Sequence, residues 1–196
     1  MMLSILENKN IVLASASPRR KELLLKAGLT FTIIVADIDE SISIEKPIEN
    51  EICRLSVAKA AVVSNRHKGI IIAADTVVIC DGSVLTKPKS LEDAKKKLML
   101  LSGKVHDVLT AYTVRDTVSN KDITRCVKTE VTFFDMPEEF IDWYLSSGDY
   151  LDKAGAYAIQ EKGMLLVKKI EGSYTNVVGL PVEYVFRDVI QLGIGE

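Results

Sequence analysis

The segment IVLASASPRRKELLLKAG, residues 11–28, carries the signals of a buried strand, a tight turn and a helix. Its apolar start predicts a strand over Asn10–Ala14. Ser17 followed by Pro18 is the combination favoured at a helix cap and at the first helical position. Gly28 is suited to end that helix. The chain is therefore expected to begin with a strand–turn–helix unit.

The turn of this unit carries groups that bind phosphate. Ser15 and Ser17 supply hydroxyl groups, and Arg19 and Arg20 supply guanidinium groups. A helix N-terminus adds unpaired backbone N–H groups and the positive end of the helix dipole. We interpret these four side chains as substrate-binding and the protein as an enzyme that handles phosphates.

Length and composition indicate one soluble globular domain over residues 1–196. The chain has 47% apolar and 27% charged residues, which is ordinary for a folded protein. Its 196 residues suffice for one sizeable core and are short for two independent domains. The formal net charge of −2 speaks against a general nucleic-acid binder.

Cysteine usage and hydropathy favour a cytoplasmic protein. Cys53, Cys80 and Cys126 are odd in number and form no CxxC pair, so we expect reduced thiols. The N-terminus lacks the basic and apolar stretches of a signal peptide. The longest apolar run, Ile70–Cys80, is interrupted by Asp75 and is too short to span a bilayer. No membrane partner is expected.

Strand and helix signals alternate along the rest of the chain. Asp81-Gly82 predicts a hairpin, and Ser119–Asp122 predicts a second turn. Hairpins among helices predict an α/β fold with a mixed, twisted β-sheet flanked by helices, in two lobes around a cleft. The expected strands are Asn10–Ala14, Phe31–Ala36, Gly69–Cys80, Ser83–Thr86, Val105–Arg115, Thr124–Phe134, Ala156–Ile159 and Met164–Ile170; the expected helices are Pro18–Ala27, Asn50–His67, Leu91–Leu101, Pro137–Ser147 and Pro181–Leu192.

Asp75 interrupts GIIIAADTVVIC, a nearly continuous apolar run of the kind found in a central strand. A buried carboxylate without a partner is costly, so Asp75 needs a cation, a metal or a set of donors. One interpretation is a catalytic or metal-binding acid. The other is a structural acid at a strand kink or beside a buried arginine.

Two further charged residues have a functional and a structural interpretation. Glu40 ends the acidic sequence DIDE, which either offers oxygen ligands to Mg²⁺ or is a solvated loop. Lys59 lies on the apolar stripe of its helix with Leu55 and Val62, so it either extends past the core to solvent or points into a cleft.

Three more residues are candidates for substrate contacts. Lys87 is held extended by Pro88, which fixes where its ammonium can point, although taken alone it is more readily interpreted as an ordinary loop lysine. Gln160 follows a short run of small residues, where its amide could contact a nucleobase or satisfy backbone groups. Thr76 follows Asp75 and is expected on the opposite face of the strand.

Other features give no functional signal. The phosphate-loop, dinucleotide, zinc-protease and hydrolase-elbow motifs do not occur. His67 and His106 have no partner pattern and are taken as structural. The stretch Glu45–Glu51 is interpreted as mixed-charge and solvated.

Taken together, the cations, the two acids and the helix start would hold a triphosphate with a divalent metal and activate a water molecule.

The chain resembles the Maf family of nucleoside triphosphate pyrophosphatases over nearly its whole length. The motifs that carry this resemblance are LASASPRRKELL (13–24), DIDE (37–40), AKA (58–60), AADTVV (73–78), LTKP (85–88), LSGKVHDVLTA (101–111), DKAGAYAIQ (152–160) and GSYTNVVGLP (172–181).

The resemblance implies a Maf/ITPase-like fold and hydrolysis of a nucleoside triphosphate to the monophosphate and pyrophosphate, with Mg²⁺ or Mn²⁺. It implies that Asp75 is the catalytic carboxylate and that Glu40 is its partner acid at the metal. Arg20, Thr76 and Gln160 match the three positions that separate the family's substrate classes. At these positions the chain resembles the branch that acts on dTTP and UTP. Modified pyrimidine triphosphates are further expected substrates. The branch preferring methylated guanosine triphosphate carries Trp where this chain has Arg19. A homodimer is also implied.

Two other functions remain open at this point. One is a nucleotide-binding regulator of cell division without turnover, and the other is a pyrophosphatase for deaminated purines such as ITP and XTP. A panel of triphosphates assayed for pyrophosphate release distinguishes all three functions.

Overall fold

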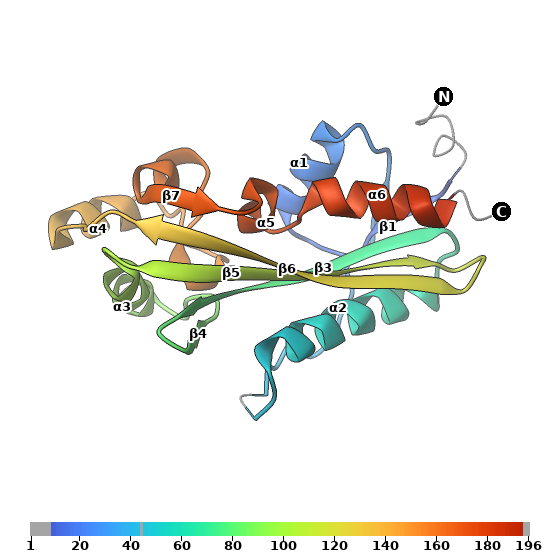
Figure 1. The fold of residues 1–196 in the computed structure, drawn as a ribbon, viewed down its shortest axis with the longest axis horizontal. Helices are drawn as coiled ribbons and strands as arrows, with labels where there is room; N and C mark the ends of the chain where they lie inside the picture. Colours follow the sequence, from blue (N-terminus) through green and yellow to red (C-terminus); the bar gives the residue numbers. More distant parts are fainter. Residues whose placement is uncertain (1–8, 44, 194–196) are drawn as a thin grey trace. The chain divides into compact units, whose positions relative to one another are not determined.

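The computed structural model describes residues 9–43 and 45–193. Within them, seven strands form one sheet in the order β2-β1-β3-β5-β6-β7, with β4 paired to β3 (Figure 1). β1 is parallel to both β2 and β3, whereas the β3–β4 and β6–β7 pairs are antiparallel. The mixed sheet flanked by helices is therefore confirmed.

The elements alternate along the chain as expected of an α/β fold. The strands are β1 (Ile11–Leu13), β2 (Thr32–Ile33), β3 (Ile70–Cys80), β4 (Ser83–Leu85), β5 (Val105–Asp116), β6 (Lys121–Phe133) and β7 (Val167–Glu171). The helices are α1 (Pro18–Lys26), α2 (Ile48–Ser64), α3 (Leu91–Leu101), α4 (Glu138–Leu145), α5 (Tyr174–Val178) and α6 (Val182–Gly193), with short 3₁₀ helices η2 (Ala154–Ala156) and η3 (Glu161–Leu165).

The chain divides into two compact units. The first lies within residues 1–75, 110–127 and 179–196, and the second comprises residues 76–109 and 128–178. The division falls between Asp75 and Thr76, in the middle of β3. In the first unit, α2 covers one face of the strands, and α1 and α6 lie on the other face (Figure 1).

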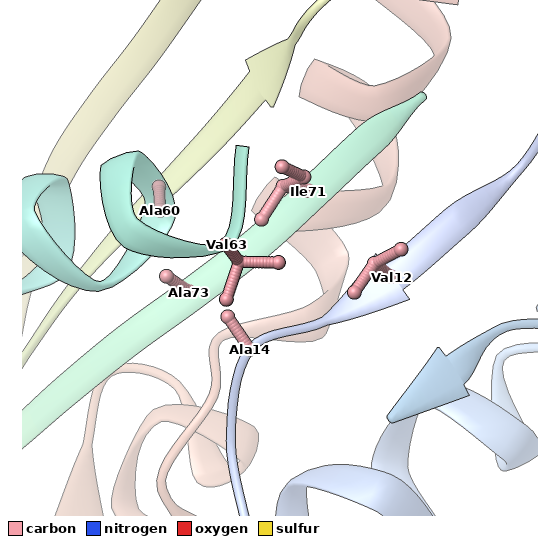
Figure 2. Close-up of a cluster of buried hydrophobic side chains, with 6 residues drawn as sticks. All are labelled: Val12, Ala14, Ala60, Val63, Ile71 and Ala73. Atoms are coloured by element: carbon pink, nitrogen blue, oxygen red, sulfur yellow. The ribbon is translucent and has the colours of Figure 1, made fainter. Parts of the chain in front are cut away.

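The core of the first unit joins β1 and β3 to α2. Because successive strand residues face opposite sides, Val12 and Ala14 point the same way, as do Ile71 and Ala73. These side chains meet Ala60 and Val63 of α2 in one buried cluster (Figure 2). The residues between them, such as Leu13 and Ile72, are buried on the opposite face. Burial on both faces explains why these strands are apolar without a break.

Local turn chemistry explains the β3–β4 hairpin. Asp81 and Gly82 both have positive φ angles, of 49° and 73°, and Cys80 pairs with Ser83 around them. A two-residue hairpin turn of type I′ requires positive φ at both central residues. The predicted hairpin is confirmed. The turn between β5 and β6 ends at Asn120 (φ 55°), whereas the sequence predicted a turn over Ser119–Asp122.

Two strand predictions were wrong in the second unit. Residues 156–159 form no strand, because Gly155 and Ala156 have φ angles of 68° and 62°, which are incompatible with an extended chain, and η2 ends there. Met164 and Leu165 belong to η3, so the strand predicted from Met164 begins only at Val167. The short helix α5 was not predicted.

The other boundaries differ by a few residues. The strand expected over Phe31–Ala36 is limited to Thr32–Ile33, and α2 covers Ile48–Ser64 where Asn50–His67 was expected. Among the described residues, no helix combines the length and apolarity needed to cross a membrane.

We predict that Gly69→Ala strongly destabilises the protein. Gly69 has a φ of 130°, and a Cβ there would lie 2.0 Å from the carbonyl oxygen of Asn10, at the start of the β1–β3 pair. The strain and the overlap together should lower the free energy of unfolding by about 3 kcal/mol or more. Urea denaturation followed by circular dichroism measures the change.

Gly28→Ala is the matched control. Gly28 also has a positive φ, of 79°, but a Cβ there would meet nothing within 4 Å. Only the backbone strain then acts, so the expected loss is about 1 kcal/mol. Equal losses in the two variants would show that overlap with Asn10 is not the cause.

Candidate active site

The β1–α1 turn is built as its sequence predicts. The Ser17 side chain caps α1 by accepting a hydrogen bond from the backbone N–H of Arg20 at 3.4 Å, and Pro18 occupies the first turn. The Ser15 hydroxyl accepts a hydrogen bond from the backbone N–H of Ser17 at 3.2 Å. Both hydroxyls therefore shape the turn, and each keeps a proton that it can donate. Their substrate-binding role stays a prediction.

Arg20 is anchored by three acceptors from different segments. Its Nε donates to the carbonyl oxygen of Gly179 at 2.7 Å, and its Nη1 donates to Ser15 Oγ at 3.2 Å and to the carbonyl oxygen of Ala74 at 2.9 Å. Burial lowers the pKa of Arg20, while the negative charge of Asp75 opposes that shift. An arginine keeps its proton under such conditions, so the guanidinium remains a fixed cation beside β3.

Lys59 is the central cation of the site. Its side chain is only 7% exposed, and its Nζ lies 2.6 Å from Asp75 Oδ1 and 2.7 Å from Glu40 Oε1. The interpretation that Lys59 extends past the core to solvent is therefore wrong. The ion-pair partner of Asp75 is this lysine, which comes from α2. The buried Arg20 also lies near enough for the charge of Asp75 to act on it.

The carbonyl oxygen of Ala74 connects the two cations. It accepts a hydrogen bond from Arg20 at 2.9 Å and from Lys59 at 3.5 Å. The backbone immediately before Asp75 is thus held by two positive groups. This fixes the position from which the Asp75 carboxylate projects.

The loop carrying Glu40 is held by Glu51 and Arg54, two residues that the sequence patterns did not single out. Glu51 is 3% exposed and accepts hydrogen bonds from Arg54 and from the backbone N–H of Ser43. Arg54 also donates to the carbonyl oxygen of Ser41 at 2.9 Å. These hydrogen bonds lower the pKa of Glu51. The interpretation of Glu45–Glu51 as wholly solvated is wrong at Glu51.

A sequence signal for this anchor did exist. Glu51 lies in the first turn of α2, directly before the buried residue Ile52, and it is followed three positions later by Arg54. An acid near a helix N-terminus with a cation at that spacing forms a local ion pair. Asp39, in the same loop, accepts hydrogen bonds from Ser41 and so caps the turn beside Glu40.

Three of the four remaining candidates belong to the second unit. Thr76 directly follows Asp75 along β3, and the exposed Lys87 follows β4. Gln160 is half-buried and precedes η3. Arg19, in the first unit, is half-buried in the first turn of α1. The contacts predicted between these four residues and substrate stay predictions.

The two carboxylates fit a divalent metal that is shared with phosphate. Glu40 Oε1 and Asp75 Oδ1 both contact one ammonium group, so both are within reach of a single cation. Among the described residues no group of three or more His, Cys, Asp or Glu side chains could hold a metal. Mg²⁺ in phosphate-binding sites takes one or two carboxylates and completes its shell with water and phosphate oxygens. The donor set therefore suits such an ion.

Comparison with known proteins shows the family of this chain. The family model described as "Maf-like protein" matches residues 10–191. The chain belongs to the Maf family. Relatives called dTTP/UTP pyrophosphatase are 43% identical over 187 residues in Bacillus cereus (strain ATCC 10987 / NRS 248) and 46% identical over 174 residues in Geotalea uraniireducens (strain Rf4). These alignments cover 95% and 88% of this Maf chain and 91% and 90% of the relatives.

A solved structure supports the fold of this Maf chain. A HAM1 protein from Coxiella burnetii aligns with a TM-score of 0.51 at 14% identity, over 94% of this chain and 98% of that one. The likeness concerns the fold alone, at that level of identity. It agrees with the mixed sheet and flanking helices described above.

We predict that Arg20→Lys destabilises this Maf protein. A lysine has one ammonium group and cannot reproduce the fork that joins Gly179, Ser15 and Ala74. Buried acceptors would lose their donors, which should lower the free energy of unfolding by about 1–3 kcal/mol. Urea denaturation measures the loss.

Arg66→Lys serves as the control, because Arg66 is an exposed arginine of the same unit. It should change the free energy of unfolding by less than about 0.5 kcal/mol. If the two variants were equally stable, the anchoring role of Arg20 would be refuted.

Proposed function

We propose that this protein is a nucleoside triphosphate pyrophosphatase that hydrolyses dTTP and UTP to the monophosphate and pyrophosphate. The observation that carries the proposal is the cluster in which Arg20 and Lys59 flank the carboxylates of Glu40 and Asp75. The relatives named dTTP/UTP pyrophosphatase, which align over most of both chains, supply the substrate class. The proposal includes clearing of unwanted pyrimidine triphosphates, among them modified ones, from the nucleotide pool.

The proposed reaction is attack of water on the α-phosphorus. Asp75 orients the water and takes its proton, a new bond forms between the water oxygen and phosphorus, and the bond to the β-phosphate oxygen breaks. Glu40 and Asp75 would hold Mg²⁺ or Mn²⁺. That ion supplies charge neutralisation at the phosphate oxygens and polarises the α-phosphorus.

The leaving pyrophosphate gains negative charge as the bond breaks. Arg19, Arg20, Lys59 and Lys87 supply positive groups to oppose it, together with the N–H groups of the first turn of α1. Groups that are already fixed before the reaction stabilise such charge best. The anchoring of Arg20 by three acceptors supports this role.

The finer parts of the proposal rest on the family resemblance. Arg20, Thr76 and Gln160 would select the base, the protein would act in the cytoplasm, and it would form a homodimer. No nucleic-acid partner is proposed, given the net charge of −2.

We expect pyrophosphate, and no orthophosphate, from dTTP and UTP in the presence of Mg²⁺, with turnover abolished by EDTA. Asp75→Asn should lower kcat at least about 100-fold, because it removes the proton acceptor. Circular dichroism should show an unchanged fold. Product release from a panel of triphosphates, separated by ion-exchange chromatography, measures both effects.

Asp37→Asn is the matched control, because Asp37 is an exposed acid of the DIDE sequence. It should retain wild-type turnover. Full turnover in Asp75→Asn would exclude the assigned role of Asp75. Selectivity for ITP would favour the deaminated-purine enzyme, and the absence of any product would favour the non-catalytic regulator.

Thr76 and Gln160 should affect the choice of base more than the rate. We expect Gln160→Ala to change the ratio of kcat/KM for dTTP to that for a purine triphosphate by about tenfold, since a lost hydrogen bond to a base edge is a discrimination effect. Steady-state kinetics on both substrates measures the ratio. Equal losses on every triphosphate would contradict the role of Gln160 in base selection.

A further inference from the structure

Lys59 forms the same kind of bridge between Glu40 and Asp75 that a divalent metal would form. Its Nζ lies 2.7 Å from one carboxylate and 2.6 Å from the other. The ammonium therefore provides one positive charge that the two acids share in the absence of metal.

Burial makes this bridge different from a surface ion pair. The Asp75 side chain is 13% exposed and that of Lys59 is 7% exposed, so both are poorly screened by solvent. The Glu40 side chain is 48% exposed, and ions in solution can reach it. What opposes binding of a free metal ion is therefore charge and not access.

Two described cations lie close enough to Glu40 and Asp75 to offset their charges. Lys59 contacts both acids directly, and Arg20 is near enough for both to act on its pKa. Two cations thus offset two carboxylates. A site without net negative charge attracts a free divalent cation weakly.

A bound triphosphate changes this balance. The phosphate oxygens are new acceptors for the ammonium group of Lys59. The charge-assisted hydrogen bonds to phosphate are as strong as those to Glu40 and Asp75 that Lys59 gives up. Once the ammonium turns to phosphate, both carboxylates are left for the metal that neutralises the same phosphate group. Metal and nucleotide then stabilise each other in the site.

We propose that Lys59 is an internal counter-ion that yields Glu40 and Asp75 to the metal only when nucleotide phosphates accept its ammonium group. The metal therefore enters together with the nucleotide and not before it. This inference rests on the proposed function, because it takes Glu40 and Asp75 as the metal ligands.

The test is a titration of the full-length protein with Mn²⁺ in the absence of nucleotide. The electron paramagnetic resonance signal of the free ion measures how much Mn²⁺ is bound. Wild type should bind weakly. Lys59→Met removes the charge and should bind Mn²⁺ at least about tenfold more tightly, since a unit charge a few ångströms away acts strongly at low screening. Lys59→Gln is a second neutral variant, which keeps a hydrogen-bond donor but no charge. It should show the same tighter Mn²⁺ binding, and it replaces Lys59→Met if that variant folds poorly.

Two controls separate charge from other effects. Lys59→Arg keeps the positive charge and should bind Mn²⁺ within about threefold of wild type. Lys95 also bridges two carboxylates, Glu138 at 2.7 Å and Asp142 at 2.6 Å, but on the surface. Lys95→Met should leave Mn²⁺ binding unchanged. Circular dichroism and thermal unfolding check the fold of each variant.

A second arm adds a dTTP analogue with a non-hydrolysable α,β-methylene bridge. Wild type should then bind Mn²⁺ tightly, and the advantage of the neutral variants should disappear. Suppose both neutral variants bind free Mn²⁺ no more tightly than wild type, yet bind it tightly with the analogue. This result would overturn the counter-ion role of Lys59 and leave the proposed metal site intact. Tight binding of free Mn²⁺ by wild type would also overturn that role. Failure of every variant to bind Mn²⁺ with the analogue would overturn both the inference and the proposed metal site.

Discussion

A carboxylate in the middle of the long, mostly buried strand β3 is the constraint on which the site depends. Asp75 interrupts β3, whose neighbours Ala73 and Ala74 are fully buried. Such a group is tolerated only with a charge partner and hydrogen bonds. The ion pair with Lys59 and the two cations on the Ala74 carbonyl meet that need. The requirement for compensation therefore brings α1, α2 and β3 together at one point.

The position of α2 follows from the same requirement. Ala60 and Val63 pack on Val12, Ala14, Ile71 and Ala73, where small side chains let the helix lie close to the strands (Figure 2). Lys59 directly precedes Ala60 and so projects beside this contact. At the other end of the helix, Glu51 and Arg54 hold the loop that presents Glu40. One helix thus supplies both the central cation and the support of the second acid.

The sequence predicted the elements with strong local signals and missed those decided by tertiary contacts. Ser17, Pro18 and the Asp81-Gly82 pair determine a cap and a turn from neighbouring residues alone, and both are confirmed. The strand expected at Ala156–Ile159 failed because backbone conformations at Gly155 and Ala156 outweigh the apolar pattern. Local pattern also could not decide between a solvated and a buried Lys59, since its partners lie elsewhere in the chain.

The hydrogen bond from Arg20 Nε to the carbonyl oxygen of Gly179 joins the two ends of the sequence. A chain still being synthesised has the turn, the lysine and both acids long before it has this acceptor. The guanidinium cannot be fully anchored until nearly the whole polypeptide has left the ribosome. A prematurely terminated product would thus contain most of the chemical groups but not their final arrangement, so unfinished chains should not act on the nucleotide pool.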